Sequence, residues 1–284
     1  MSATTDTTLD AAAQTAVAAA PGKPDTIVLI HGLWLTPLSW EHWKARYEAA
    51  GFTVVVPRWP GEAEDVDAVR ADPSGMDGIG ITDIVDHYAA IIQALPTPPI
   101  LIGHSFGGLF VQLLLDRGLG AVGVAISPAA VKGVLALPPA QLKAAFPVLG
   151  NPRNRKRTVK LTFEQFHWGF ANALDEDAAR VAYDRYHVPG PGRPLFQAAL
   201  GNLVPNPQNK ADLKNPDRAP LLLMSNSLDR TVPASTVREL LKRWKKSPAV
   251  TELKEYEGRS HFTAGEPGWE QVADDALEWS LAHA

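Results

Sequence analysis

Ser105 occurs in a G-x-S-x-G motif between two different kinds of sequence. The short apolar run over 99–102, just before the motif, predicts a buried strand. The amphipathic run over 109–117, after it, predicts a helix. At such a junction the chain turns sharply, the serine oxygen stands clear of the strand end, and the flanking glycines leave room for neighbouring backbone. We therefore expect Ser105 to be a nucleophile, and a structural serine in a Gly-rich turn is the alternative.

Two further residues follow predicted strands later in the chain. Asp229 comes just after a strand predicted over 220–224, and His261 just after one over 250–256. A serine hydroxyl is a weak nucleophile without a base, and histidine is a better base when a carboxylate fixes its tautomer. The sequence therefore predicts a Ser105–His261–Asp229 triad, although His261 could instead be a surface residue and Asp229 a loop or helix-capping residue. Two less favoured rivals for the acid are Asp212 and Asp217.

Acyl transfer also needs two backbone amides aimed at the oxygen that becomes charged. One is expected from Phe106, which follows the serine, and the other from Leu33, in the loop after a strand predicted over 26–30. Trp34 is expected to line the same pocket. His31 in this loop could act as a second base, but we favour a structural role in which it holds the loop by hydrogen bonds.

The elements that must position these residues alternate along the chain. Six strands are predicted, over 26–30, 52–56, 99–102, 121–126, 220–224 and 250–256. Helices are predicted between and after them, over 40–50, 82–95, 109–117, 236–245 and 269–283. Continuous Val/Ile/Leu runs without alternation indicate strands covered on both faces, and hence a mainly parallel α/β sheet. Right-handed crossovers bring the carboxyl ends of such strands to one edge, where ligands bind.

The alternation stops between residues 128 and 217. This stretch is predicted to be helical over 139–146, 162–173, 175–186 and 195–200, and a helical insertion between two strands of one sheet predicts a cap or lid over the strand ends. An aromatic cluster in it consists of Phe163, Phe166, His167, Trp168 and Phe170. We expect one or two members, with Phe166 and Trp168 as the candidates, to line an apolar acyl pocket while the others pack the cap onto the core. A basic run over 153–160 is interpreted as a solvated loop, with contact to an anionic substrate or a membrane surface as the alternative.

Composition limits the classes of protein that the chain can represent. A net charge of −4 gives no nucleic-acid footprint, and the absence of cysteine excludes disulfides, thiolate catalysis and Cys-ligated metals. No apolar run approaches the ~20 residues that span a bilayer. Residues 1–24 are Ala/Thr-rich and are expected to form a flexible tail, with an unusual export signal as the alternative. We expect a cytoplasmic protein without metal, cofactor or nucleic-acid partner.

Taken together, these motifs resemble the α/β-hydrolase superfamily, specifically its compact serine esterase and lipase-like branch. The resemblance rests on His31-Gly32, the elbow over 103–108, Asp229 with Val232-Pro233, and 258–262, and it extends from about residue 25 to the C-terminus. The chain order serine, aspartate, histidine also matches. The resemblance implies a core over 25–127 and 218–284, a helical cap over 128–217, and cofactor-independent hydrolysis of a small-molecule carboxylic ester through an acyl-enzyme.

The chain departs from the family pattern in two respects. Too few residues precede Thr26 for the usual N-terminal β-hairpin, so we expect a sheet trimmed to six strands, and the cap sequence matches no cap whose ligand could be carried over. Thioester, amide or carbamate hydrolysis, acyl transfer to an acceptor other than water, and lyase chemistry remain alternatives. A ligand-binding receptor on the same fold is an alternative from a different class. The natural substrate, the preferred acyl length and the oligomeric state do not follow from the sequence.

Overall fold

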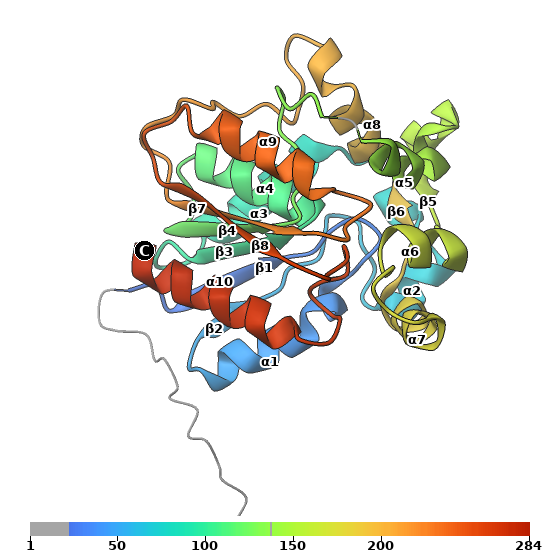
Figure 1. Ribbon diagram of the computed structural model, residues 1–284, viewed down its shortest axis with the longest axis horizontal. Helices are drawn as coiled ribbons and strands as arrows, with labels where there is room; N and C mark the ends of the chain where they lie inside the picture. Colours follow the sequence, from blue (N-terminus) through green and yellow to red (C-terminus); the bar gives the residue numbers. More distant parts are fainter. Residues whose placement is uncertain (1–22, 137) are drawn as a thin grey trace, which may run out of the picture.

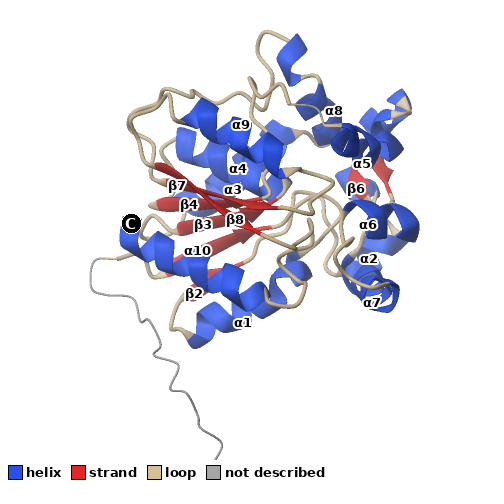
Figure 2. Ribbon diagram, viewed as in Figure 1, coloured by secondary structure: helices blue, strands red, loops and turns tan. Residues whose placement is uncertain are grey.

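A computed structural model describes residues 23–136 and 138–284. The predicted tail over 1–24, and with it the alternative of an export signal, lies almost entirely outside these residues. The described chain forms one sheet between two layers of helices, with further helices gathered at one end of the sheet (Figures 1 and 2).

The sheet has six strands, and every pair of neighbours is parallel. Its order is β2-β1-β3-β4-β7-β8, with bounds β1 Thr26–Ile30, β2 Thr53–Val55, β3 Ile100–His104, β4 Val122–Ile126, β7 Leu221–Asn226 and β8 Thr251–Tyr256. The four inner strands are buried throughout, as continuous apolar runs require, whereas β8 at one edge alternates between half-buried and exposed residues. The predicted six-stranded, mainly parallel sheet is confirmed.

Alternate residues of each inner strand point to opposite helical layers. Val28 and Leu101 pack with helices α3 Ile81–Gln93, α4 Phe106–Asp116 and α9 Ala234–Trp244. Ile27 and Ile100 pack on the other face with α1 Glu41–Ala49 and α10 Trp269–His283. Both faces of the sheet are therefore covered by helices through apolar contacts. Only the strand ends are free of these two layers and available to form a site.

The segment between β4 and β7 supplies most of the helices at one end of the sheet (Figure 1). It contains α5 Pro139–Leu149, η3 Pro152–Lys156, β5 Thr158–Val159, α6 Phe163–Gly169, α7 Glu176–Tyr186, β6 Gly190–Pro191, α8 Arg193–Ala199 and η4 Gly201–Leu203. The antiparallel pair β5–β6 was not predicted, because two residues are too few for a strand pattern. Three short elements before α3 were also not predicted. They are η1 Pro37–Trp40, α2 Val66–Ala71 and η2 Ser74–Met76.

Candidate active site

Ser105 occupies a strained turn between β3 and α4. Its φ of 56° and ψ of −118° lie where L residues are rarely found, and such strain persists only where the surrounding structure holds it. The flanking glycines are sterically required: a Cβ on Gly103 would lie 2.2 Å from the Gly107 carbonyl oxygen, and one on Gly107 would lie 2.0 Å from the Ile30 carbonyl oxygen. The turn has the geometry of a nucleophile elbow.

His261 is paired with Asp229 in a fully buried contact. The Nδ1 atom of His261 donates to Oδ2 of Asp229 over 2.7 Å, and neither side chain is exposed. The other carboxylate oxygen accepts from the amides of Thr231 and Val232 at 2.8 and 2.7 Å, which fixes its orientation. With Nδ1–H committed to the carboxylate, the lone pair of the neutral ring lies on Nε2, as a general base requires. That nitrogen is buried and has no hydrogen-bond partner among the described residues.

The elbow and the loop that carries His261 are in direct contact through His104. The Nε2 atom of His104 lies 2.8 Å from the His261 carbonyl oxygen, and the two rings are 4.7 Å apart. Burial and the neighbouring His261 hold the pKa of His104 well below its usual range, so this ring is a neutral donor. Within the described chain, Ser105 Oγ makes no hydrogen bond to His261 Nε2. In many hydrolytic sites that bond tightens only when substrate is bound.

The loop after β1 lies against the elbow. A Cβ on Gly32 would be 2.8 Å from Cβ of Ser105, so the backbone approaches the serine as closely as glycine allows. Leu33 is buried, and Phe106 begins α4 with an amide that has no acceptor in its own helix. Neither of these two amides donates to another described residue. Trp34, with a φ of 68°, accepts a hydrogen bond from the insertion at its carbonyl.

His31 holds this loop from within. Its Nδ1 lies 3.0 Å from the Gly32 carbonyl oxygen, and its Nε2 lies 3.1 Å from Oε2 of Glu62, which also accepts from the Trp59 amide at 2.8 Å. The ring stacks on Trp59 at 5.2 Å between centroids. These contacts are those of a loop anchor. Glu62 has no sequence signal, because it lies in an irregular connection and meets His31 only through the fold.

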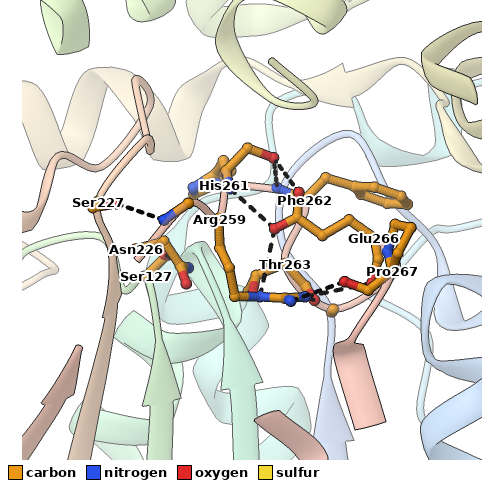
Figure 3. A network of polar contacts seen from close by, with 12 residues as sticks. Ser127, Asn226, Ser227, Arg259, His261, Phe262, Thr263, Glu266 and Pro267 are labelled. Carbon is orange, nitrogen blue, oxygen red and sulfur yellow. Dashed lines mark hydrogen bonds and ion pairs between the residues drawn. The ribbon is translucent and has the colours of Figure 1, made fainter. Parts of the chain in front are cut away.

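A second buried carboxylate secures the loop that carries His261 (Figure 3). Glu266 accepts from the amide and the hydroxyl of Ser260 at 3.0 and 2.8 Å, and burial raises the pKa of this carboxyl group. Arg259 donates to the hydroxyl and the carbonyl oxygen of Thr263 at 2.5 and 2.7 Å. The residues on both sides of His261 are thereby fixed by side chains from the same short loop.

Aromatic residues of the insertion lie directly on this pair. Phe170 packs edge-to-face on the His261 ring with centroids 4.5 Å apart, and its carbonyl oxygen accepts from the Phe262 amide at 2.8 Å. Phe166 is fully buried behind it, stacked at 5.3 Å, and Trp34 meets the edge of Phe170 at 6.2 Å. Phe170 was predicted only as one member of the cluster, and no sequence signal ranks it above Phe166.

Trp168 lies farther out on the insertion. The Nζ atom of Lys143 is 4.0 Å from the centroid of its ring, and the Arg230 guanidinium carbon is 5.2 Å away. Trp168 lines two surface cavities of 730 and 390 Å³, neither of which is lined by Ser105 or His261.

The two rival aspartates are remote from His261. Asp212 is exposed, and its amide donates to Asp116 at the end of α4. Asp217 is also exposed and lies just before β7, at the amino-terminal edge of the sheet. The residues predicted to form the triad and the oxyanion hole instead lie at the carboxyl-terminal edge.

The described residues contain neither a cluster of metal ligands nor a membrane-spanning helix. No group of three or more His, Asp or Glu side chains within residues 23–136 and 138–284 could hold a metal ion. None of the helices described there is long and apolar enough to cross a membrane.

Solved structures share this fold across nearly the whole chain. A monoacylglycerol lipase from Paleococcus ferrophilus is 23% identical with a TM-score of 0.65, and 93% of this chain and 97% of that chain are covered. Polyneuridine aldehyde esterase is 17% identical with a TM-score of 0.65, covering 91% and 100%. A pyrethroid hydrolase from Sphingobium faniae is 17% identical with a TM-score of 0.64, covering 91% and 98%. At these identities the likeness establishes the fold alone.

The sequence itself gives the family. It has no significant match among curated proteins. The model of a family described as "Alpha/beta hydrolase family" matches residues 27–275, which include the elbow, the loop after β1 and the His261–Asp229 pair. The chain therefore belongs to the alpha/beta hydrolase family.

Proposed function

We propose that the protein hydrolyses carboxylic esters through an acyl-enzyme on Ser105. The observation that carries this proposal is the buried His261–Asp229 pair, whose free Nε2 belongs to a loop held directly against the strained elbow. A ring with one nitrogen tied to a carboxylate and the other unpartnered is ready to accept a proton. His104 and His187 also have one buried ring nitrogen without a partner, but their other nitrogen meets a backbone group, whereas that of His261 meets a carboxylate.

The proposed reaction has two halves. Ser105 Oγ attacks the ester carbonyl carbon while His261 Nε2 takes the hydroxyl proton, and the amides of Leu33 and Phe106 hold the oxyanion. The tetrahedral intermediate collapses to the acyl-serine, and His261 returns the proton to the departing alkoxide. Water then attacks the acyl carbon with His261 again as base, which releases the acid and restores Ser105.

The insertion over 128–217 is proposed to act as the cap that selects the substrate. Ser105 is only 4% exposed and His261 is not exposed, so the cap must shift to admit an ester. We propose that Trp34 lines the acyl pocket together with Phe170, which contacts the base, and that Phe166 supports Phe170 from behind. A substrate contact at Trp168 would require a cap position in which this ring turns inward.

Covalent labelling tests the nucleophile. A fluorophosphonate should form one adduct, located on Ser105 by mass spectrometry of the digested protein. Ser105→Ala should abolish the adduct, whereas Ser74→Ala, at an exposed serine of η2, should leave it unchanged. An adduct on another residue, or none under conditions that label a known esterase, would refute the assignment.

A substrate panel tests the ester assignment. The similar structures are named lipase, esterase and hydrolase, which favours esters among the acyl compounds that this machinery could attack. We expect kcat/KM to be highest for the ester when an ester, thioester, amide and carbamate of the same acyl group are compared. Binding without turnover of any member would instead support a receptor on this fold.

A further inference from the structure

A cavity of 590 Å³ opens on the insertion, and it is lined by none of Ser105, Asp229 and His261. Its walls come from η3, from α8, from the segment over 204–208 and from the loop before α3. Sites for small molecules typically measure about 300–1,000 Å³, so the cavity is large enough for one.

Three cations line this cavity, and its lining includes no carboxylate. Arg155 and Lys156 come from η3, and Arg193 begins α8. The Arg155 guanidinium carbon lies 4.8 Å from the centroid of the Phe196 ring, and Arg193 donates to the Gly78 carbonyl oxygen at 2.5 Å. No ion pair in the described chain involves any of these three side chains. Their charge is available to a ligand.

Two glutamines add oriented donors to the same wall. The Oε1 atom of Gln197 accepts from the Ile81 amide at 2.9 Å, and that of Gln208 accepts from the Thr82 amide at 3.0 Å. Both carbonyl ends are thus committed to the start of α3. The two NH₂ groups donate to no described residue, so the cavity presents amide donors together with cations.

Two carboxylates of the segment that includes Gly78, a lining residue, accept hydrogen bonds from backbone amides. Asp77 accepts from the Thr158 amide and Asp83 from the Gly80 amide, each at 2.7 Å. The insertion as a whole is also rich in positive charge, as the cavity is. Residues 128–217 contain 12 Lys and Arg and 7 Asp and Glu, whereas the whole chain contains 27 Lys and Arg and 31 Asp and Glu. The insertion is cationic in an anionic protein, which favours the approach of an anion.

Apart from Asn206, the remaining side chains of the wall are apolar. Phe196 is 7% exposed, and Leu200, Val204 and Pro207 continue the same surface. We propose that this cavity binds a small amphipathic anion, a carboxylate or phosphate group attached to an alkyl or aromatic group. The anionic group contacts Arg155 and Arg193, because guanidinium forks match the geometry of both oxyanions, and the apolar group lies on Phe196 and Leu200.

Calorimetric titration of the full-length protein tests the site without using turnover. Octanoate and octyl phosphate carry both parts of the proposed ligand, octanol carries only the chain, and acetate and inorganic phosphate carry only the charge. We expect measurable binding for octanoate or octyl phosphate, and the tighter of the two identifies the preferred head group. Each truncated probe should bind about tenfold more weakly or worse, the scale of losing a charged hydrogen bond or a buried chain.

Matched variants locate the binding. Arg155→Gln and Arg193→Gln should each raise the Kd about tenfold or more, whereas Arg153→Gln, at an exposed cation of η3 outside the cavity, should leave it unchanged. Leu200→Gln should weaken the octyl compounds but not the short anions, and thermal melting confirms that each variant is folded. Equal binding of octanol and octanoate would overturn the proposal, as would unchanged Kd values in both cavity arginine variants. Because no step uses Ser105, a failure here leaves the esterase proposal intact.

Discussion

At the scale of single residues, Asp229 divides its two oxygens between different tasks. Oδ1 accepts two backbone amides, and Oδ2 accepts Nδ1–H of His261. In Asp229→Asn the amide oxygen can keep the backbone contacts, which turns NH₂ toward His261. The histidine must then accept at Nδ1 and carry its proton on Nε2, where a base is needed. We expect kcat for an ester to fall roughly 10²–10⁴-fold while the fold is retained.

Asp212→Asn is the matched control for this variant, since it removes an exposed carboxylate remote from His261. Steady-state kinetics and circular dichroism on both variants decide the matter. A nearly normal kcat in Asp229→Asn would show that another group orients His261, and a large loss in the control would show that the acid was assigned to the wrong loop.

At the scale of elements, the junction of β3 and α4 depends on close backbone packing. Gly107→Ala would place a methyl carbon 2.0 Å from the Ile30 carbonyl oxygen. Neither atom can move away without a shift of the backbone, because the methyl carbon is bonded directly to Cα and the oxygen is a backbone atom. We expect the free energy of unfolding in urea to fall by about 3 kcal/mol or more, the upper range for overpacking. Gly118→Ala, beyond the other end of α4, meets no atom within 4 Å but has a φ of 73°. It should cost only about 1–2 kcal/mol of left-handed strain, and equal losses would contradict the steric account.

The insertion contains a histidine that resists protonation. His187 is fully buried, stacks on Tyr183 and accepts from the Leu161 amide, and burial, aided by Lys160 and Arg70, lowers its pKa to about 3. The unfolded chain takes up this proton near the ordinary pKa of about 6.5, so the stabilisation is present above that pH and is lost as the pH falls toward 3.

Replacing this histidine should make the protein less sensitive to acid. Between pH 7 and pH 5 the free energy of unfolding should fall by about 2 kcal/mol less in His187→Gln than in the unchanged protein, because glutamine can accept from Leu161 but does not titrate. Urea denaturation at both pH values measures this. His42→Gln, at an exposed histidine of α1, serves as control. An identical pH response in His187→Gln would show that this ring is not the group responsible.

The parts of this architecture that were predictable are those with strong local patterns. Apolar runs predicted five of the six strands, β8 was predicted from a largely polar stretch, and the G-x-S-x-G motif predicted the turn at Ser105. Contacts made only by the fold were not predictable. Glu62 reaches His31 across 31 positions, and Glu266 is one acidic residue among many until its loop closes on Ser260. Phe166 and Phe170 share a helical face, so the docking of the insertion alone decides which of them meets His261. The roles assigned to the triad remain predictions until labelling and kinetics test them.

At the scale of the whole molecule, removal of residues 1–20 deletes none of the described helices or strands. We expect the melting temperature and the rate of ester hydrolysis of the shortened protein to match those of the full chain. Differential scanning calorimetry and a p-nitrophenyl ester assay provide the comparison. A marked drop in either quantity would show that these residues dock on the core or complete a contact between copies.

The sheet order has a consequence for synthesis on the ribosome. β4 and β7 are neighbours, yet residues 127–220 are made between them. The entropy of closing so long a connection exceeds that of a twenty-residue one by only roughly 1 kcal/mol, so the final stability is hardly affected. The larger effect is on the time for which β4 stays unpaired, because its apolar edge has no partner until residues 221–226 leave the ribosome. Unpaired strand edges invite association with other chains. Nascent chains halted before residue 221 are therefore the ones we expect chaperones to retain.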